Sequence, residues 1–447
     1  MQKRHIFSSA IMTAAMAMTL ATAGCHGRAS RHTADADSVQ APLAVNFYLE
    51  RSGSMIPYDS PKGRGEFKDA IMSLLNVLPQ DNDSTGCDGV RLFVVNDGVY
   101  EYPKTFREFI TDKNIFETTR GIGDASFTDF GKILDSLFCH AQDNDISILA
   151  SDMIYSTQDV GVVNTEKIFS EAKAMTQTIM KESGKGKSVV LVKLNASFVG
   201  TYYPYNRPSG VNYNGTRPYY LMIVGSDASM NRLMTESKYQ KFIQFTELNG
   251  YEQMMLFCGD NCYSPYYSLV QNDRDTKGRM RTDRKHNEGE GIHAVTDVET
   301  DRNTGELQMV VALNMGNMFI EESYLSNPAN YSIKADDKVD IVSIAPIQHS
   351  DITQNNRDVM DKATHRMVLN MEKFTHDQEI TISLRNQFQQ WIIESSSDDD
   401  SHPDAGNPQF ASTTFSLRYL MQGIYDSYAN QKKDELNYFT IKLSINK

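Results

Sequence analysis

The sequence of 447 residues has few cysteines, no excess of basic residues and no long apolar run after its N-terminus. Its five cysteines include no second Cys or His pair at zinc-finger spacing, which argues against a zinc site of that type. No later stretch reaches the roughly 18 apolar residues that a bilayer-spanning helix needs. The formal charge of −13 argues against nucleic-acid binding, because a phosphate backbone requires cations on its partner.

Common catalytic motifs are also missing. The sequence contains no G-x-S-x-G elbow, no P-loop and no H-E-x-x-H motif. His140 is the histidine nearest to the polar positions discussed below, and it ends a stretch with helical spacing, which favours a structural role. We therefore expect a binding protein and not an enzyme. A hydrolase that uses a carboxylate pair in the second half of the chain is a further alternative.

The N-terminal 24 residues have the pattern of a targeting signal. Lys3 and Arg4 precede a run of small and apolar residues, and Ala23-Gly24 comes directly before Cys25. This resembles a bacterial lipoprotein box, which implies lipidation of Cys25 and a lipid anchor in the cell envelope, at the outer membrane, on either face. An ordinary secretory signal is the alternative. Removal of residues 1–24 changes the formal charge from −13 to −15, and residues 25–42 form a polar, flexible tether.

Export would place the remaining cysteines in an oxidising compartment. Cys258 and Cys262 flank Gly-Asp-Asn, whose residues favour a turn, so a disulfide between them is expected. Cys87 and Cys139 are either paired or free.

Residues 43–250 show alternating strand and helix patterns, which predict a first domain with an α/β fold. Strands are expected at residues 43–49, 90–95, 99–102, 146–150, 188–194 and 218–224, and helices at residues 66–78, 128–139, 165–180 and 229–245. Asp97-Gly98 between two β-rich runs predicts an antiparallel hairpin. The stretch 202–213 is expected to be a loop or an insertion. Otherwise the alternation favours a doubly wound, mainly parallel sheet.

Polar side chains follow two of these strands. Glu50, Ser52 and Ser54 follow the first strand, and Asp152 follows the strand at 146–150. Ligands of such sheets bind beyond the carboxyl ends of the strands, where the strand order reverses, so both acids would meet there. Thr128, at the start of a helix, would join them. The alternatives are a serine-rich turn that caps the next helix and a plain N-cap at Thr128.

These elements resemble a von Willebrand factor type A domain with a metal-ion-dependent adhesion site. That family has Asp-x-Ser-x-Ser after its first strand, a later threonine, and an aspartate after its fourth strand. Glu50-x-Ser52-x-Ser54, Thr128 and Asp152 match these elements, except for the first acid. The resemblance covers about half the chain. It implies hydroxyl ligands from the serines and threonine, acids acting directly or through water, and an open metal position for a partner carboxylate.

The resemblance implies a divalent cation as cofactor, Mg²⁺, Mn²⁺ or Ca²⁺, and a protein or glycan partner at the cell envelope. Glu50 is the departure from the family pattern. Its carboxylate reaches about 1.5 Å further than that of Asp, and Mg²⁺ tolerates such a change less well than Ca²⁺. The alternative is a related fold without metal, acting as a structural subunit of an envelope assembly.

Residues 251–447 are expected to form a second, β-rich, sandwich-like domain. Strands are predicted at residues 251–258, 340–344, 366–371, 379–384 and 438–445, and a hairpin at residues 292–314. A helix is expected at residues 413–428. The acidic stretch 395–407 has the composition of a disordered loop.

Overall fold

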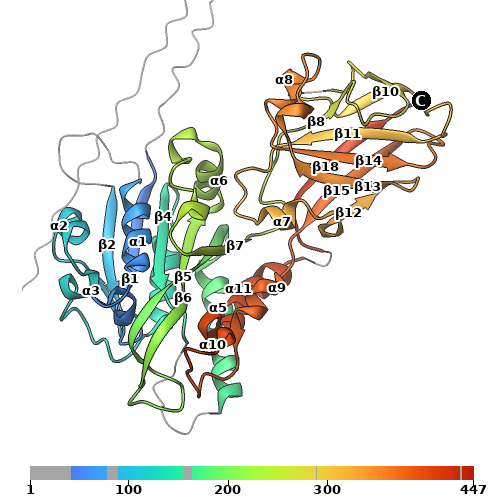
Figure 1. Cartoon of the computed structure of the whole chain (residues 1–447). Helices are drawn as coiled ribbons and strands as arrows, with labels where there is room; N and C mark the ends of the chain where they lie inside the picture. The colour runs from blue at the N-terminus through green and yellow to red at the C-terminus, as the bar shows by residue number, and fades with distance from the viewer. Residues whose placement is uncertain (1–41, 78–88, 156–163, 288, 433–434) are drawn as a thin grey trace, which may run out of the picture. The chain divides into compact units, whose positions relative to one another are not determined.

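The computed structural model describes residues 42–447, except 78–88, 156–163, 288 and 433–434 (Figure 1). The signal, Cys25 and the tether therefore lie outside the described residues, apart from Pro42, and so does Cys87. Residues 42–447 form one unit by their contacts. Within the described part, no helix combines the length and the apolar character needed to cross a membrane.

The first half is built on a seven-stranded sheet with the order β3-β2-β1-β4-β6-β5-β7. Its strands are β1 (Ala44–Glu50), β2 (Val90–Val95), β3 (Val99–Glu101), β4 (Asp145–Ser151), β5 (Lys187–Tyr202), β6 (Val211–Ser226) and β7 (Tyr251–Phe257). The prediction of an antiparallel hairpin at Asp97-Gly98 is confirmed, because β2 and β3 pair antiparallel.

The prediction of a mainly parallel sheet is wrong. Only β1 pairs in parallel with its neighbours, β2 and β4, among the described strands of this sheet. The β4–β6, β5–β6 and β5–β7 pairs are antiparallel. For β5 and β6 the reason lies in the stretch 202–213, because the two strands form one long hairpin on either side of the connection at residues 203–210. A direct hairpin connection forces antiparallel pairing, whereas a parallel pair needs a crossover.

Helices cover both faces of this sheet, as the α/β alternation predicts. The helices of the first half are α1 (Glu66–Asn76), α2 (Phe106–Thr111), α3 (Ile115–Thr118), α4 (Phe130–His140), α5 (Thr165–Ser183) and α6 (Asp227–Thr235), with short 3₁₀ turns η1 (Ile56–Asp59), η2 (Ser237–Tyr239) and η3 (Phe245–Glu247). Phe47 of β1 packs in the core cluster that contains α1, whereas Tyr48 packs in the cluster that contains α4 and α5. This alternation follows from the two-residue period of a strand.

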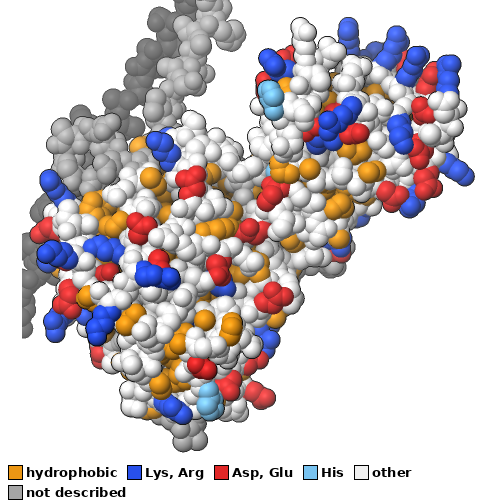
Figure 2. Space-filling view, in the orientation of Figure 1, with side chains coloured by type: hydrophobic (Ala, Val, Ile, Leu, Met, Phe, Trp, Pro, Cys, Tyr) orange, Lys and Arg blue, Asp and Glu red, His pale blue; other side chains and the backbone are white. Residues whose placement is uncertain are grey.

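The second half contains two further sheets, with the orders β12-β15-β18-β10-β9 and β13-β14-β11-β8. The strands are β8 (Tyr267–Val270), β9 (Arg279–Thr282), β10 (Ala294–Glu299), β11 (Leu307–Leu313), β12 (Tyr331–Lys334), β13 (Asp340–Pro346), β14 (His365–Met371), β15 (Gln378–Arg385) and β18 (Asn437–Ile445). Between them lie α7 (Glu322–Leu325), η4 (Pro328–Asn330), η5 (His349–Asp351) and α8 (Arg357–Met360). Inward side chains of both sheets, such as Val311 and Ile441, share one core cluster. Figure 2 shows acidic and basic side chains mixed over the visible surface.

The predicted hairpin at residues 292–314 is wrong in its pairing. β10 pairs with β9 and β18, whereas β11 pairs with β8 and β14 in the other sheet. The turn at residues 300–305 therefore crosses from one sheet to the other. Turn residues locate a change of chain direction, but they do not determine which strands pair.

The C-terminal region returns to the first half of the chain. It contains α9 (Gln390–Glu394), β16 (Ser396–Ser397), α10 (Pro408–Ser412), β17 (Thr414–Phe415) and α11 (Leu417–Ala429). Leu420 and Ile424 of α11 lie in the same core cluster as Leu134 of α4 and Ile179 of α5. This region thus packs on the helices beside the first sheet, although it follows the expected domain boundary at residue 250. The apolar face of α11 needs a covering surface, and the helices beside the first sheet supply it.

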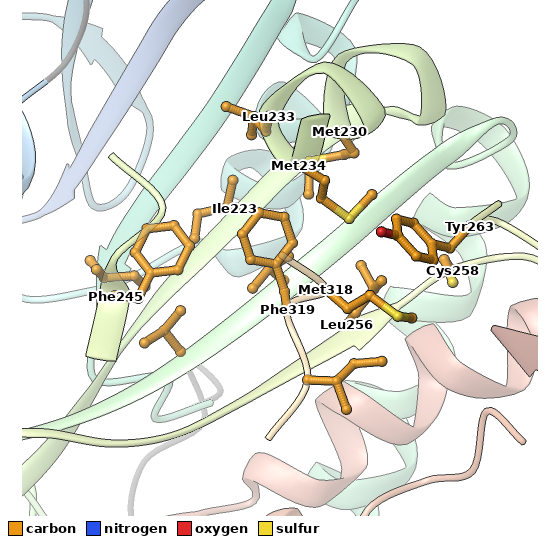
Figure 3. Close-up of a cluster of buried hydrophobic side chains, with 14 of the residues drawn as sticks. Ile223, Met230, Leu233, Met234, Phe245, Leu256, Cys258, Tyr263, Met318 and Phe319 are labelled. Atoms are coloured by element: carbon orange, nitrogen blue, oxygen red, sulfur yellow. The ribbon is translucent and has the colours of Figure 1, made fainter. Parts of the chain in front are cut away.

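Part of the core cluster that contains Phe47 and Val311 links α6, β6 and β7 to the segment that follows β11 (Figure 3). Met318 and Phe319 point toward Met234 and Leu256 in this view, and the rings of Phe245 and Phe319 lie 5.7 Å apart. Each fully buried side chain of this size contributes ~1.5–3 kcal/mol of hydrophobic free energy.

Candidate functional site

The candidate site lies where β1 meets β4, at the carboxyl ends of both strands. β1 has β2 on one side and β4 on the other, and both pairs are parallel. The chain leaves β1 through α1, whose side chains pack on one face, and reaches β4 after α4, which packs on the other face. The strand order thus reverses at β1, which is where ligands bind in sheets of this kind. Glu50 ends β1, and Asp152 directly follows β4.

Glu50 is the centre of a buried hydrogen-bond network. Its side chain is 2% exposed. The Thr128 hydroxyl donates to Glu50 Oε1 over 2.8 Å, and the Ser151 hydroxyl donates to Glu50 Oε2. Three segments far apart in the sequence therefore converge on one carboxyl group. Ser151 was not among the predicted site residues, although its place at the end of β4 was visible in the sequence.

The two serines form a tight turn beside this carboxyl group. The hydroxyl oxygens of Ser52 and Ser54 lie 3.0 Å apart, and the Met55 N–H donates to Ser52 Oγ over 3.3 Å. The Gly53 N–H donates to the Ala125 carbonyl over 2.9 Å. This bond fixes the serine turn to the loop that carries the site threonine.

Thr128 does not cap α4. Asp129 is the N-cap residue, and its side chain accepts a hydrogen bond from the Lys132 N–H over 3.1 Å. The Thr128 hydroxyl is therefore directed to Glu50 instead. The alternative of a plain N-cap at Thr128 is wrong, because the neighbouring aspartate fills that role.

Asp152 is buried with one oxygen unpaired. The side chain is 1% exposed, and its Oδ1 accepts a hydrogen bond from the Ile154 N–H over 3.1 Å. Its Oδ2 has no partner among the described residues. The next residue, Met153, has a φ of 55°, which is uncommon for a residue with a side chain. Buried unpaired oxygens and unusual backbone angles concentrate at functional sites.

The two acids are electrostatically unusual. Burial, and then the charge of Asp152, raise the pKa of Glu50 to about 8. Burial raises the pKa of Asp152, and the nearby Ser54 hydroxyl opposes that rise. Neither acid takes part in any of the ion pairs between described residues. Two carboxyl groups in this position need protons or a cation, because buried charges are costly without compensation.

The predicted residues offer only oxygen atoms, which hard divalent cations prefer. Within the described part of the chain, no group of three or more His, Cys, Asp or Glu side chains could hold a metal ion. A cation here would therefore depend on the hydroxyls of Ser52, Ser54 and Thr128 as well as on the acids. The unpaired oxygen of Asp152 is compatible with such a role.

A pocket of about 310 Å³ opens above this cluster. Glu50, Ser52, Ser54 and Thr128 contribute to its lining. Its remaining lining residues are Gly53, Ala125, Ser126, Phe127, Ile154, Tyr155, Ile168, Tyr203, Pro204, Tyr205, Pro208, Asp400 and Phe415. The volume is in the lower range of small-molecule pockets.

Part of this pocket comes from regions in which the sequence predicts no site residue. Tyr203 and Tyr205 lie in the stretch 202–213, whose density of Tyr and Pro was the available signal. Asp400 lies in the acidic stretch that was predicted to be disordered, and this prediction is wrong. Asp400 is 2% exposed and accepts hydrogen bonds from the Tyr202 hydroxyl over 2.7 Å and from the Tyr205 N–H over 3.0 Å.

The cysteines lie elsewhere. Cys258 and Cys262 form a disulfide with 6.1 Å between their Cα atoms. Cys139 is a free, exposed thiol.

Comparison with known proteins gives no match, whether to a family model, to a curated protein or to a solved structure.

Proposed function

We propose that this protein is an envelope-anchored binding protein that holds a divalent cation between β1 and β4. Glu50, Ser52, Ser54, Thr128 and Asp152 would hold the ion, in a first half similar to a von Willebrand factor type A domain. The ion would bind a carboxylate of a protein or glycan partner. The observation that carries the proposal is the buried pair Glu50 and Asp152, which forms no ion pair with a described residue and has one unpaired oxygen.

The hydroxyl and carboxyl side chains of the proposed site would have different roles. The hydroxyls of Ser52, Ser54 and Thr128 would serve as neutral ligands, which do not reduce the positive charge of the ion. Glu50 and Asp152 would supply the compensating negative charge from below. When bound, the cation would supply the positive charge that attracts a partner carboxylate. The first half of the chain contributes the rigid strand ends on which these side chains are held.

The location of the protein is part of the proposal. The signal-like residues 1–24, Cys25 and the polar tether support a lipid anchor in the cell envelope, at the outer membrane. Mass spectrometry of the mature N-terminus would test this part independently. Lipid attached to Cys25 is the expected result, and an unmodified Cys25 within a longer mature chain would contradict it.

Calorimetric titration with Mg²⁺, Mn²⁺ and Ca²⁺ tests the central step. We expect one ion per chain, and loss of that binding in the double variant Ser54→Ala and Asp152→Ala. The matched control is Ser60→Ala with Asp143→Ala, which makes the same two substitutions at residues outside the proposed site and the pocket lining. A pull-down from envelope extract should then lose the partner in excess EDTA. If the partner stays bound in EDTA, the cation-bridged mechanism is refuted.

One observation favours a metal-free structural subunit as a second candidate. The Glu50 carboxyl group already accepts hydrogen bonds from Thr128 and Ser151, and its raised pKa allows it to keep a proton. In that case no divalent ion would bind in the titration. A stable envelope complex that persists in EDTA would be the positive evidence for this candidate.

A further inference from the structure

The wall of the pocket above Glu50 is rich in aromatic rings. Five of its lining residues are aromatic, namely Phe127, Tyr155, Tyr203, Tyr205 and Phe415. The rings of Tyr205 and Phe415 are stacked, with centroids 5.3 Å apart and 10° between their planes. The first comes from the connection between β5 and β6, and the second from β17. Two segments far apart in the sequence thus build one aromatic surface.

Tyr203 lies directly against the serine turn. A Cβ atom placed on Gly53 would come within 3.0 Å of Tyr203 Cε2, so the ring rests on the backbone between Ser52 and Ser54. Tyr203 is nevertheless 41% exposed. The ring therefore borders both the pocket and the solvent, where a ligand can contact it without displacing buried groups.

The ionisable side chains that line the pocket include acids but no bases. The described residues that line it include two carboxyl groups, Glu50 and Asp400, and no Lys, Arg or His. Neither acid forms an ion pair with a described residue. Asp400 is held in place by Tyr202 and Tyr205, which leaves lone pairs of its carboxylate for a further donor. A pocket with this lining attracts a positive group.

We propose that this pocket binds an organic ammonium group. Aromatic faces attract ammonium ions, and cages of several aromatic side chains recognise alkylated amines. Asp400 and the rings of Tyr203, Tyr205 and Phe415 are the residues that would hold it. The ammonium group belongs to either a small amine or a lysine side chain. This proposal goes beyond the divalent cation, because its residues are different from Ser54 and Asp152.

One ligand that has both a carboxylate and an ammonium group satisfies both the divalent-cation proposal and the ammonium proposal. A ligand whose carboxylate faces the divalent ion would otherwise meet the negative charge of Asp400. A neighbouring ammonium group on the same ligand would remove that repulsion.

The test is a titration of the purified protein in excess EDTA, by calorimetry or ligand-observed NMR. The probes are n-butylammonium, tetramethylammonium and the uncharged n-butanol. We expect saturable binding of the ammonium probes to one site, at least tenfold tighter than that of n-butanol. Equal binding of n-butanol, or no binding of either ammonium probe, would overturn the proposal.

Single substitutions test whether the ammonium probes bind in this pocket. Tyr203→Ala should weaken ammonium binding at least tenfold, and Asp400→Asn at least fivefold. Asp398→Asn is the matched control, because Asp398 lies in the same acidic segment but outside the pocket lining, and it should stay within twofold of the wild type. A loss with Asp398→Asn as large as that with Asp400→Asn would contradict a specific site. If Asp400→Asn fails to fold, Tyr203→Ala decides, since its side chain is partly exposed.

Further measurements distinguish a small amine from a lysine side chain as the source of the ammonium group. They also distinguish this inference from the proposed divalent-cation site. Tighter binding of N-acetyl-lysine methylamide than of n-butylammonium would indicate a lysine side chain, and the reverse order a small amine. Both orders support an ammonium site. Ammonium binding in EDTA without any divalent-ion binding would support this inference and refute the proposed cation mechanism, and the opposite result would refute this inference alone.

Discussion

Thr128 Oγ1 donates a hydrogen bond to Glu50 Oε1 across 2.8 Å, although the two residues are 78 positions apart in the sequence. This bond joins the loop before α4 to the end of β1. It uses the threonine hydroxyl that a helix cap would otherwise occupy, and it holds the Glu50 carboxyl group beside Asp152. The pKa of Glu50 therefore depends on residues from several parts of the site.

The first prediction concerns pH. The pKa of Glu50 is raised to about 8 in the folded protein, mainly by burial and then by Asp152, whereas an unfolded chain has a value of about 4.3. Between these values the folded protein keeps a proton that the unfolded chain releases, so its stability falls as pH rises. Each pH unit costs at most about 1.4 kcal/mol. Chemical unfolding of the protein in EDTA, from about pH 5 to about pH 8, measures this slope.

Glu50→Gln removes the titrating group and should flatten this pH dependence. Glu182→Gln, an exposed position on α5, is the matched control and should keep the wild-type slope. Equal slopes for the wild type and Glu50→Gln would show that Glu50 does not carry a raised pKa.

Much of this site was predictable because its signals are local and stand at strand ends. Glu50, Ser52 and Ser54 follow an apolar run, and Asp152 follows another, so parallel pairing of β1 and β4 brings them together. The Asp97-Gly98 hairpin was predictable for the same reason. Two residues with turn preference between β-rich runs determine the connection without help from distant parts of the chain.

Other features of the fold and of the pocket could not be predicted, because they depend on tertiary contacts. Residues 203–210 connect two strands, as the loop-like composition of the stretch 202–213 predicts, but that composition does not show that these strands, β5 and β6, pair with each other along their whole length. Asp400 lies in a sequence typical of disorder, but the Tyr202 hydroxyl and the Tyr205 N–H hold it in a buried position. A local pattern contains no information about partners that lie some 200 residues away.

The second prediction concerns the choice of ion. Glu50 is one methylene longer than the aspartate of the family pattern, and Ca²⁺ accepts more variable geometry than Mg²⁺. If the proposed cation site is correct, the wild type should bind Ca²⁺ at least tenfold more tightly than Mg²⁺. Glu50→Asp should shift the preference toward Mg²⁺. Parallel calorimetric titrations measure both affinities, and an unchanged ratio in Glu50→Asp would show that the length of this side chain does not select the ion.

The third prediction concerns the bond between Tyr202 and Asp400. Tyr202→Phe removes the hydroxyl that donates to Asp400 Oδ2 over 2.7 Å, and it leaves a buried acceptor without this partner. Such a loss costs ~1–3 kcal/mol of unfolding free energy. The adjacent Tyr203→Phe is the control, because its hydroxyl has no hydrogen bond to a described residue, and its stability should stay within ~0.5 kcal/mol of the wild type. Denaturant unfolding compares the two variants, and equal stabilities would contradict the role of this bond.

The fourth prediction concerns the packing of α11 on α5. Gly423 lies so close to α5 that a Cβ atom would come within 1.9 Å of Thr176 Oγ1 and 2.6 Å of the Lys173 carbonyl oxygen. Alanine favours a helix over glycine by ~1 kcal/mol, but the clash should outweigh this gain, so we expect Gly423→Ala to destabilise the protein by ~1–3 kcal/mol.

Gly259→Ala is the matched control, because nothing lies within 4 Å of a Cβ at that position, and thermal unfolding should show it to be near the wild type.

The packing of α11 should also affect the pocket. Phe415 and Asp400 belong to the same C-terminal region as α11, so a displaced α11 should also move them. Gly423→Ala should therefore weaken binding of n-butylammonium, whereas Gly259→Ala should not. A variant that is destabilised but binds the probe normally would show that the pocket is held without help from α11.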